Sequence, residues 1–532
     1  MRKVFFLAVF TIGLLASTTM TAQKVNMERY ITLAVKNGAV INLDFKAYTP
    51  GTPVKIVSGS NIRNITVGTK WYDISFTFTA HSSEMKVYGD VSGFACNDNG
   101  EKVTALDVSH NTQLETLYCY KNQLAALDVS NNVQLKDLGC FDNKLTDLDI
   151  SNNMLLRKLS CSYNRLTVLD VSNNMKLKEL SCSGNKLTTL DISNNVQLTE
   201  LGCSYNWLTT LDISNNAQLT KLGCSHNWLA TLDISNNEHL TELDCSHNRL
   251  TILDVTKNAK LTELDCYDNK LTALDVNNNT LLVELNCSEN QLATLDISRN
   301  TQLVKLSCSE NNLTALDVTK NTLLKRLDCY GNNLTVLDVS KCTQLTRLFC
   351  ASDRLITLDV SSNKLLTELY CHGNRLTTLD ITKNTLLTKL NCFGNKLTTL
   401  DVSKCTKLIN FDCSSNQLSS LDVSNNTLLK KLNCYDNAFT TQALDDIYCQ
   451  LPNRNDSTQM GVIKPIYDYE SENAYIVDAT NAANATAKNW RVQYYNKDNT
   501  DIPATKGQYD CNSTGVAEEA TVDEHVSLQE KR

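Results

Sequence analysis

Acidic side chains recur at a fixed spacing in the middle of this chain, and their first candidate chemistry is the binding of a basic partner. Glu242 and Glu263 stand 21 residues apart, and Asp244 and Asp265 repeat that step two positions later. Basic residues gather toward the two ends of the same strand face, at Lys136, Arg157, Lys158 and Lys178 and at Lys325, Arg326, Arg347, Lys389, Lys430 and Lys431. The pattern predicts an acidic patch that either steers a partner of complementary charge or only keeps an exposed sheet soluble.

Aromatic and histidine side chains follow the same spacing beside the acidic patch. Two of only four tryptophans stand one repeat apart, and exposed aromatics on a rigid scaffold can anchor a protein or stack on a sugar. They could also pack against each other with no partner at all. With the four carboxylates above, six residues complete the candidate partner-binding set: Tyr163, Tyr205, Trp207, His226, Trp228 and His247.

A metal site in the same region is a less well supported hypothesis than partner binding. His226, His247 and Asp268 share one column, and successive strands would place them about 4.8 Å apart. Three such groups could converge on a divalent ion, but all three are expected to be exposed on separate strands. We therefore predict no metal site and no cofactor.

The sequence contains no recognisable catalytic motif outside the repeat pattern. The sequence has no nucleophile elbow, no HExxH, no Gly-rich phosphate loop and no separate Ser/His/Asp set. The many Ser and Asp residues belong to the repeat itself. The sequence therefore predicts a protein that is not an enzyme.

The spacing of all these residues comes from a repeat that fills most of the chain. Leu stands at every twenty-first position from Leu114 to Leu429, and Cys does the same from Cys119 to Cys434, which gives sixteen copies. The stretch LTELGCSYNWLTTLDISNNAQ, residues 198–218, is one copy. A fixed period of this length predicts a solenoid, in which each coil buries its apolar face against its neighbours.

Within that copy the residue types predict the course of one coil. Residues 200–204 alternate polar and apolar, which predicts a short strand with Cys203 pointing inward. Asn206 ends the strand, and stacked Asn side chains can hydrogen-bond the backbone of their own and adjoining coils. Asp212 and Ser214 suit an Asx turn on the far side. We expect extended or 3₁₀ pieces there, because no 3.6-residue period is present.

The chain has 21 cysteines, and sixteen of them form the repeat column. Each column Cys takes a Leu-like inward position, so we expect reduced thiols that act as small buried apolar groups. In-register side chains point in parallel and are poorly placed to form bridges. Cys342 and Cys405 replace an Asn of the repeat three coils apart, too far to pair. Cys449 and Cys511 lie beyond the repeats, and whether they pair stays open.

The repeat reads L-x-x-L-x-C-x-x-N-x-L-x-x-L-D-(V/I)-S-x-N-x-x over about residues 103–439. It resembles the leucine-rich repeat, with Cys in the third apolar place, and is similar to the internalin-J type of bacterial surface protein. This resemblance implies a β-rich leucine-rich repeat solenoid with a parallel sheet on the concave face and an extended or 3₁₀ convex side. It also implies an adhesive cell-surface protein with a role in virulence.

The N-terminal flank differs from the repeat. Residues 1–22 have a basic start, an apolar stretch and a small-residue end, which predicts a secretory signal peptide. Residues 23–102 alternate with period two between turn signals such as Asn37-Gly38 and predict a small β domain that caps the solenoid.

The C-terminal flank predicts a second cap over residues 440–511. A helix is expected at 441–451, and strands at 475–477 and 490–495. Residues 512–532 are polar and predict a disordered tail.

These features together predict an exported or cell-surface interaction protein. The net charge of −8, with 20% charged residues, does not suggest a nucleic-acid partner. The mature chain is expected to have no transmembrane segment, and its concave face to bind a protein or glycan on a host or bacterial surface, as an internalin-like adhesin would. The alternatives are a glycan-binding module built on Trp207 and Trp228, and a structural spacer of the envelope or matrix.

Overall fold

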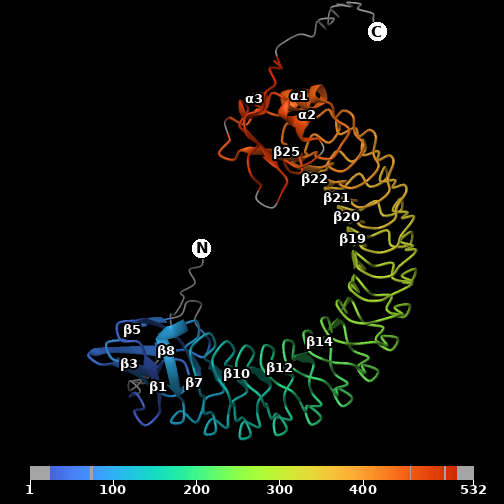
Figure 1. Cartoon of the computed structure of the whole chain (residues 1–532). Helices are drawn as coiled ribbons and strands as arrows, with labels where there is room; N and C mark the ends of the chain where they lie inside the picture. Colours follow the sequence, from blue (N-terminus) through green and yellow to red (C-terminus); the bar gives the residue numbers. More distant parts are fainter. Residues whose placement is uncertain (1–23, 72–75, 456, 472, 497–498, 512–532) are drawn as a thin grey trace, which may run out of the picture. The chain divides into compact units, whose positions relative to one another are not determined.

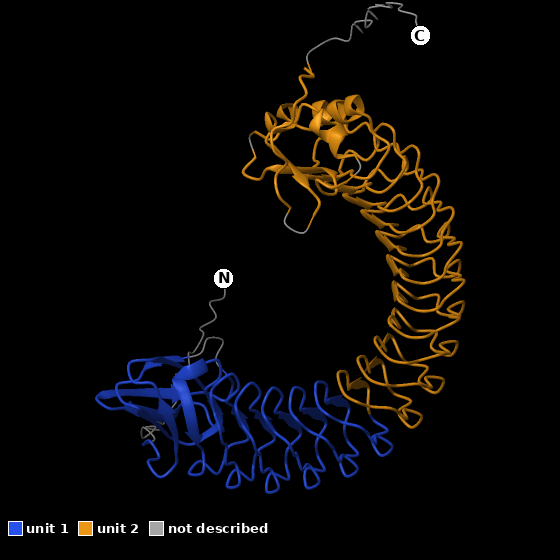
Figure 2. Cartoon of the chain, in the orientation of Figure 1, with its two compact units in different colours: residues 1–218 blue, residues 219–532 orange. Residues whose placement is uncertain are grey.

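The computed structural model describes residues 24–71, 76–455, 457–471, 473–496 and 499–511. It divides into two compact units, residues 1–218 and 219–532, which are coloured separately in Figure 2. The predicted signal peptide, 1–22, and the predicted disordered tail, 512–532, lie outside the described residues. Among those described, no helix is long and apolar enough to cross a membrane.

Unit 1 begins with an antiparallel β region that leads into the first coils. One sheet has the order β4-β3-β6-β1-β8, and β2 pairs with β5 and with β7. Ile31, Leu33 and Phe45 are fully buried between these strands, as the alternating sequence predicts. The strands are β1 Tyr30–Val35, β2 Val40–Ala47, β3 Thr52–Ser58, β4 Asn61–Val67, β5 Phe76–Thr79, β6 Glu84–Tyr88, β7 Val91–Ala95 and β8 Val103–Asp107, with one 3₁₀ turn, η1 Gly100–Lys102.

The repeat coils of unit 1 continue from this region without a gap. β7 pairs in parallel with β9, so the N-terminal region supplies a strand to the first coil and covers its core. Each later strand pairs in register with the next. These strands are β9 Thr116–Tyr118, β10 Asp137–Gly139, β11 Lys158–Ser160, β12 Glu179–Ser181 and β13 Glu200–Gly202.

Unit 2 carries the remaining coils, and its strands lie on the inner side of its own curved row of coils (Figure 1). They form a parallel, in-register sheet that runs on into β25 and β26. These strands are β14 Lys221–Gly223, β15 Glu242–Asp244, β16 Glu263–Asp265, β17 Glu284–Asn286, β18 Lys305–Ser307, β19 Arg326–Asp328, β20 Arg347–Phe349, β21 Glu368–Tyr370, β22 Lys389–Asn391, β23 Asn410–Asp412, β24 Lys431–Asn433, β25 Gly461–Ile466 and β26 Trp490–Tyr494.

A short strand followed by tight turns explains the shape of each coil. The strand is three residues long, shorter than the predicted 200–204, because the chain turns at Tyr205 into the left-handed region, with φ 55°. On the far side Asp212 accepts a hydrogen bond from the Ser214 N–H at 2.9 Å, the predicted Asx turn. Successive i→i−3 bonds follow in most coils, as at Asn174 and Leu177, and this is the expected 3₁₀-type geometry.

Two buried columns of Asn side chains tie the coils together. The strand-side ladder, residues 122 to 437, was predicted: Asn164 donates to the carbonyls of Cys140 and Cys161, both at 3.0 Å, and its Oδ1 accepts from the Leu145 N–H. The far-side ladder, residues 111 to 426, was not predicted: Asn174 donates to the Ile150 and Asn153 carbonyls at 3.1 and 3.0 Å. Both satisfy carbonyl groups that no strand pairing reaches.

The cysteine column is buried and reduced, as predicted. All sixteen thiols, from Cys119 to Cys434, are free and inaccessible. Burial also raises their pKa, for example that of Cys182 to about 12, so the thiols stay protonated and apolar. Cys342 and Cys405 are buried and free within the far-side ladder.

The C-terminal region of unit 2 closes its own end of the solenoid. Its helices are α1 Thr441–Gln450, α2 Ala474–Asp478 and α3 Ala483–Thr486, and Thr440 caps α1 by accepting from the Ala443 N–H. Cys449 and Cys511 form a disulfide with a Cα–Cα distance of 5.4 Å, which answers the open question of their pairing.

Two C-terminal expectations need correction. The strand predicted at 475–477 is helix α2, because a three-residue apolar run does not distinguish strand from helix. The strand β25 was missed, although it extends the parallel sheet beyond the last repeat.

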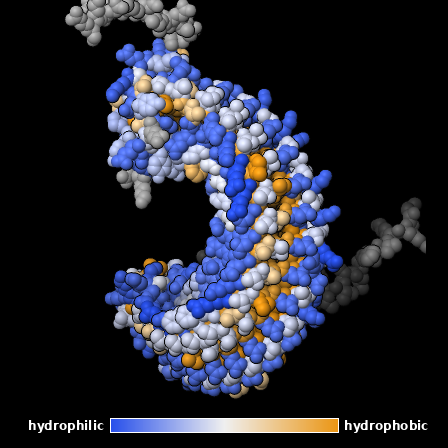
Figure 3. Space-filling view, turned by 45° about the vertical axis from the view of Figure 1, so that its right-hand side comes forward, coloured by the Kyte–Doolittle hydropathy of each residue, from blue (hydrophilic) through white to orange (hydrophobic). Residues whose placement is uncertain are grey.

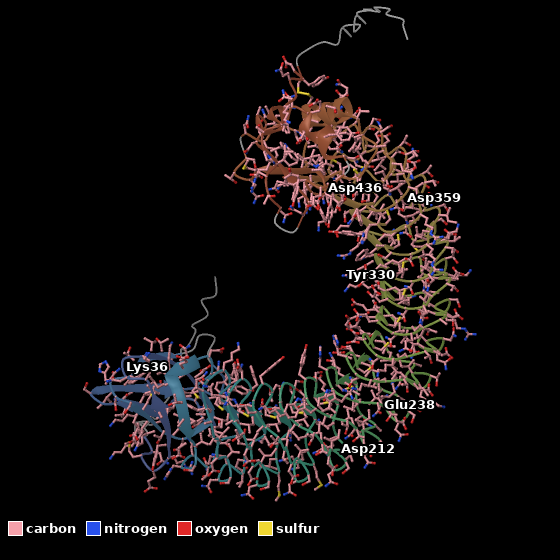
Figure 4. All side chains as sticks on the ribbon, viewed as in Figure 1. Lys36, Asp212, Glu238, Tyr330, Asp359 and Asp436 are labelled. Atoms are coloured by element: carbon pink, nitrogen blue, oxygen red, sulfur yellow. A yellow bond between two sulfur atoms is a disulfide. The ribbon has the colours of Figure 1, made fainter. Side chains whose placement is uncertain are left out.

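The surface of the coils varies in hydropathy, and their inner and outer sides carry different residues. Figure 3 shows a mainly hydrophilic surface with a narrow line of hydrophobic side chains along one flank. In unit 2, Figure 4 places Tyr330 on the inner side of the coils and Glu238 and Asp359 on the outer side.

Candidate functional site

The outward-facing strand residues of unit 2 form a groove that is the candidate functional site. In strands such as β15 and β16 the middle Leu is buried, and the first and third side chains face outward. Parallel register places Glu242 beside Glu263 and Asp244 beside Asp265. The four predicted acidic residues therefore come together, on two neighbouring strands.

The groove has a volume of about 560 Å³ and crosses six strands, β14 to β19. This volume lies within the range of roughly 300–1,000 Å³ that is typical of ligand pockets. Its charged and polar walls are Lys221, Glu242, Asp244, Glu263, Asp265, Glu284, Asn286, Lys305, Ser307 and Arg326.

The charges of the groove are balanced at its ends and unbalanced at its centre. Lys221 pairs with Glu242 at 2.7 Å, and Lys305 pairs with Glu284 at 2.5 Å. Glu263, between these pairs, is exposed and has no cationic partner among the described residues. The centre can therefore accept a cation from outside.

The two central aspartates are held by hydrogen bonds rather than by cations. Asp244 accepts from the Ser246 N–H and Oγ at 3.1 and 2.6 Å, and Asp265 accepts from the Tyr267 N–H at 3.0 Å. Burial, supported by the negative charge of Asp244, raises the pKa of Asp265 above its ordinary value. A cation that entered the groove would relieve this unfavourable arrangement.

The histidines of the set lie at the strand ends of unit 2, outside the groove lining. The His226 and His247 rings stack with centroids 3.8 Å apart, and His247 Nδ1 lies 2.7 Å from Asp268 Oδ2. Burial and the neighbouring His247 lower the pKa of His226, so this ring is neutral at pH 7. Among the described residues no group of three or more His, Cys, Asp or Glu side chains is arranged to hold a metal.

The aromatic members of the set are exposed but are divided between the units. Unit 1 carries Tyr163, Tyr205 and Trp207, of which Trp207 is 44% exposed. Unit 2 carries Trp228, which is 48% exposed and has the Arg249 guanidinium 5.5 Å from its ring centroid. The shared Trp207 and Trp228 platform therefore stays a prediction.

The column of Tyr205 and His226 has a left-handed backbone conformation that was not predicted from the sequence. Its non-glycine members have positive φ, for example 55° at Tyr205 and 51° at His226. Only Gly adopts this region freely, and the column has Gly at positions 184, 331, 373 and 394. These scattered glycines were the sequence signal for a left-handed turn position.

A second group of side chains on the unit 2 strand face was also missed. Tyr330, Phe349 and Tyr370 form a row with ring centroids 4.5 and 5.0 Å apart. Phe349 and Tyr370 share the column of Asp244 and Asp265, since each is the third residue of its strand. Reading that column past the acidic patch would have found them.

The coils, with their Leu core, Asn ladders and free buried cysteines, define a leucine-rich repeat solenoid with a cysteine ladder. No protein-family model and no curated protein matches the sequence. Among solved structures, the functional domain of InlJ from Listeria monocytogenes, which includes a cysteine ladder, is 34% identical with a TM-score of 0.56. That match covers 67% of this chain and 77% of the Listeria chain. The chain therefore belongs to the internalin family of leucine-rich repeat proteins.

Two further structures support the fold. A leucine-rich repeat protein of Leptospira interrogans is 27% identical with a TM-score of 0.57, over 62% of this chain and 91% of that one. The plant peptide hormone receptor RGFR1, solved in complex with RGF2, is 22% identical with a TM-score of 0.54, over 63% of this chain and 64% of that one. The second likeness concerns the fold alone.

Proposed function

We propose that this chain is an exported or cell-surface interaction protein, an internalin-like adhesin that binds a host or bacterial macromolecule through its strand face. The acidic groove of unit 2 would receive a basic segment of a partner protein. The observation that supports this is the unpaired Glu263 between two internally neutralised ends. A macromolecular partner that supplies Lys or Arg completes this charge pattern, and such complementarity favours fast and specific association.

Other parts of the proposal come from the family and the sequence. The membership in the internalin family supports export, adhesion and a role in virulence, and the absence of catalytic motifs supports a chain that is not an enzyme. The boundaries between signal peptide, N-terminal β domain, repeats and C-terminal cap stay predictions.

The test is a binding screen of the purified chain against host extracellular proteins and whole bacterial cells, with Glu263→Gln beside it. Removal of the central charge should weaken a true hit by about tenfold, and raised salt should weaken the unaltered chain as well. Glu238→Gln removes an equal charge from the outer side of unit 2 (Figure 4) and is the matched control. A hit that both variants bind equally well would show that the groove is the wrong site.

A glycan-binding role is the second candidate, and it depends on the exposure of Trp207 and Trp228. A glycan array with the Trp207→Ala/Trp228→Ala variant tests it, because sugar stacking on these rings cannot survive their removal. Glycan binding that is unchanged in this variant would contradict the platform. The absence of any hit in both screens would favour the structural spacer.

A further inference from the structure

A small hollow on the strand face of unit 2 lies beyond the acidic groove, over strands β21 to β24. Its volume is about 210 Å³, and it is lined by Tyr370, Lys389, Leu390, Asn391, Asn410, Phe411, Asp412, Lys431 and Asn433. Register explains the hollow: Asn410 lies between Lys389 and Lys431, so a short side chain separates two long ones. This volume is below the roughly 300–1,000 Å³ of sites for drug-sized molecules, so the hollow suits one small ring.

One side of the hollow is an aromatic wall. Tyr370 lines it directly and continues the row of Phe349 and Tyr330 on the preceding coils. The Arg347 guanidinium lies 5.7 Å from the Tyr370 ring centroid, which helps to fix the ring. A flat apolar surface at the edge of a polar hollow suits a ligand with one apolar face and a polar rim.

The opposite side carries an uncompensated positive charge. Lys389 is paired with Glu368 at 2.9 Å, but Lys431 has no acidic partner among the described residues. Lys464 lies beyond Lys431 on β25, and burial together with the charge of Lys431 lowers its pKa. The one carboxylate in the lining, Asp412, is engaged by Ser414 and by Asn433. These neutral donors do not cancel the charge of Asp412, so an anionic group of a ligand is favoured only next to Lys431.

A residue in the lining of the same hollow carries a buried acceptor. Asn433 is 3% exposed and donates to Asp412 Oδ2 at 2.7 Å, but its Oδ1 has no donor among the described residues. The far-side ladder also has such oxygens, yet those lie inside the solenoid, whereas Asn433 lines the hollow. A buried acceptor without a donor is costly, so a ligand hydroxyl that donates to it would be bound favourably.

We propose that this hollow binds a carboxylated sugar ring of a glycan. The apolar face of the ring lies against Tyr370, its carboxylate meets Lys431, and a hydroxyl donates to Asn433 Oδ1. Asn391 and Asn410 also line the hollow, and their amides can hydrogen-bond further hydroxyls. An inorganic anion would use the lysine but neither the aromatic wall nor the acceptor, and an acidic peptide has no ring of hydroxyls.

The experiment measures ligand binding to the full chain by saturation-transfer NMR and titration calorimetry. Sodium glucuronate is the probe, with glucose and an Asp-rich peptide as comparison ligands, and an oligogalacturonate is the probe for a uronate ring within a longer glycan. The chain should bind glucuronate and the oligogalacturonate, and glucose at least about tenfold more weakly, because glucose lacks the charge that pairs with Lys431. Equal binding of glucose, stronger binding of the Asp-rich peptide, or no binding of any acidic sugar would overturn the proposal.

Variants locate the site. Lys431→Gln should weaken glucuronate binding by about tenfold, whereas Lys407→Gln, an exposed lysine outside the lining, should leave it unchanged. Tyr370→Ala should also weaken it, with circular dichroism to confirm that the coils remain folded. Loss of binding in Trp207→Ala/Trp228→Ala instead would move the sugar site to that pair, and would equally overturn the proposal.

Discussion

Position 353 carries a carboxyl group where the other fifteen coils of the strand-side ladder carry an amide. Asp353 Oδ1 accepts from the Asn332 and Leu334 N–H groups at 3.0 and 3.3 Å, and its buried Oδ2 has no donor among the described residues. In a neighbouring coil, Asn374 donates to the Cys350 and Cys371 carbonyls. A protonated Asp353 can replace one such donor, whereas an ionised one cannot.

The ionisation of Asp353 should make stability depend on pH. Burial raises its pKa to about 7, and the groups that face it are the buried thiols of Cys308, Cys329 and Cys350. In an unfolded chain the carboxyl has a pKa of about 3.9. The folded state therefore binds the proton more tightly, so stability falls as pH rises through this interval and levels off above about pH 7.

Asp353→Asn should remove this dependence. Between pH 5 and pH 8 the variant should gain about 2–3 kcal/mol over the unaltered chain, as read from denaturant unfolding at the two pH values. The exposed Asp359→Asn is the control, since Asp359 lies on the outer side of unit 2 (Figure 4). An advantage of Asp353→Asn that is the same at both pH values would show that the carboxyl is not protonated in the folded chain.

At the scale of the element, each coil depends on one left-handed residue, which is the third residue after its strand, as Gly394 is after β22. Gly394 has φ +64°, and an added Cβ there would meet only the Gly373 backbone at 3.6 and 3.7 Å. The space is therefore sufficient, and backbone strain alone opposes a side chain. This position isolates the energetic contribution of the turn from that of packing.

Gly394→Ala should destabilise the protein by about 1 kcal/mol, since L-residues pay roughly that much in the left-handed region. Thermal unfolding measures it. Gly202→Ala is the control, because Gly202 has an ordinary φ and its added Cβ would lie 3.5 Å from the Ser183 hydroxyl. If the two variants have the same melting temperature, the left-handed turn contributes little to the stability of a coil.

How far the sequence predicts the structure also becomes clear at this scale. The Leu, Cys and Asn columns predicted the coil, the buried thiols and the strand-side ladder, because a column forces identical residues into identical surroundings. The candidate site was predicted only in part: Glu242, Asp244, Glu263 and Asp265 do share a groove. What the period did not reveal depends on local geometry, such as the ion pair of Lys305 with Glu284 and the hollow beside Tyr370.

At the scale of the molecule, each unit contains a series of coils in which each strand pairs with the strands of the neighbouring coils. In such a series stability is approximately a sum over coils and the interfaces between them. Removal of one complete coil should therefore leave the others folded. Deletion of residues 156–176 removes a coil of unit 1 and leaves every residue of the groove in place.

The matched deletion of residues 261–281 removes Glu263 and Asp265 from the groove. Both deletions should keep the circular dichroism per residue and melt cooperatively. Only the second should lose binding of the basic partner, by tenfold or more, in the same assay. A first deletion that unfolds the chain would contradict a nearest-neighbour solenoid, and a second that binds normally would contradict the groove.

The buried cysteine column makes it possible to measure which part of the chain unfolds first. Each thiol reacts with an alkylating reagent only after its own coil admits water, and the sixteen reactive positions are numbered along the chain from Cys119 to Cys434. Pulse labelling under mild denaturant, followed by peptide mass spectrometry, would convert unfolding into an ordered series of tagged positions. The native thiols would in this way give the order in which the coils open, with no engineered cysteine or fluorophore.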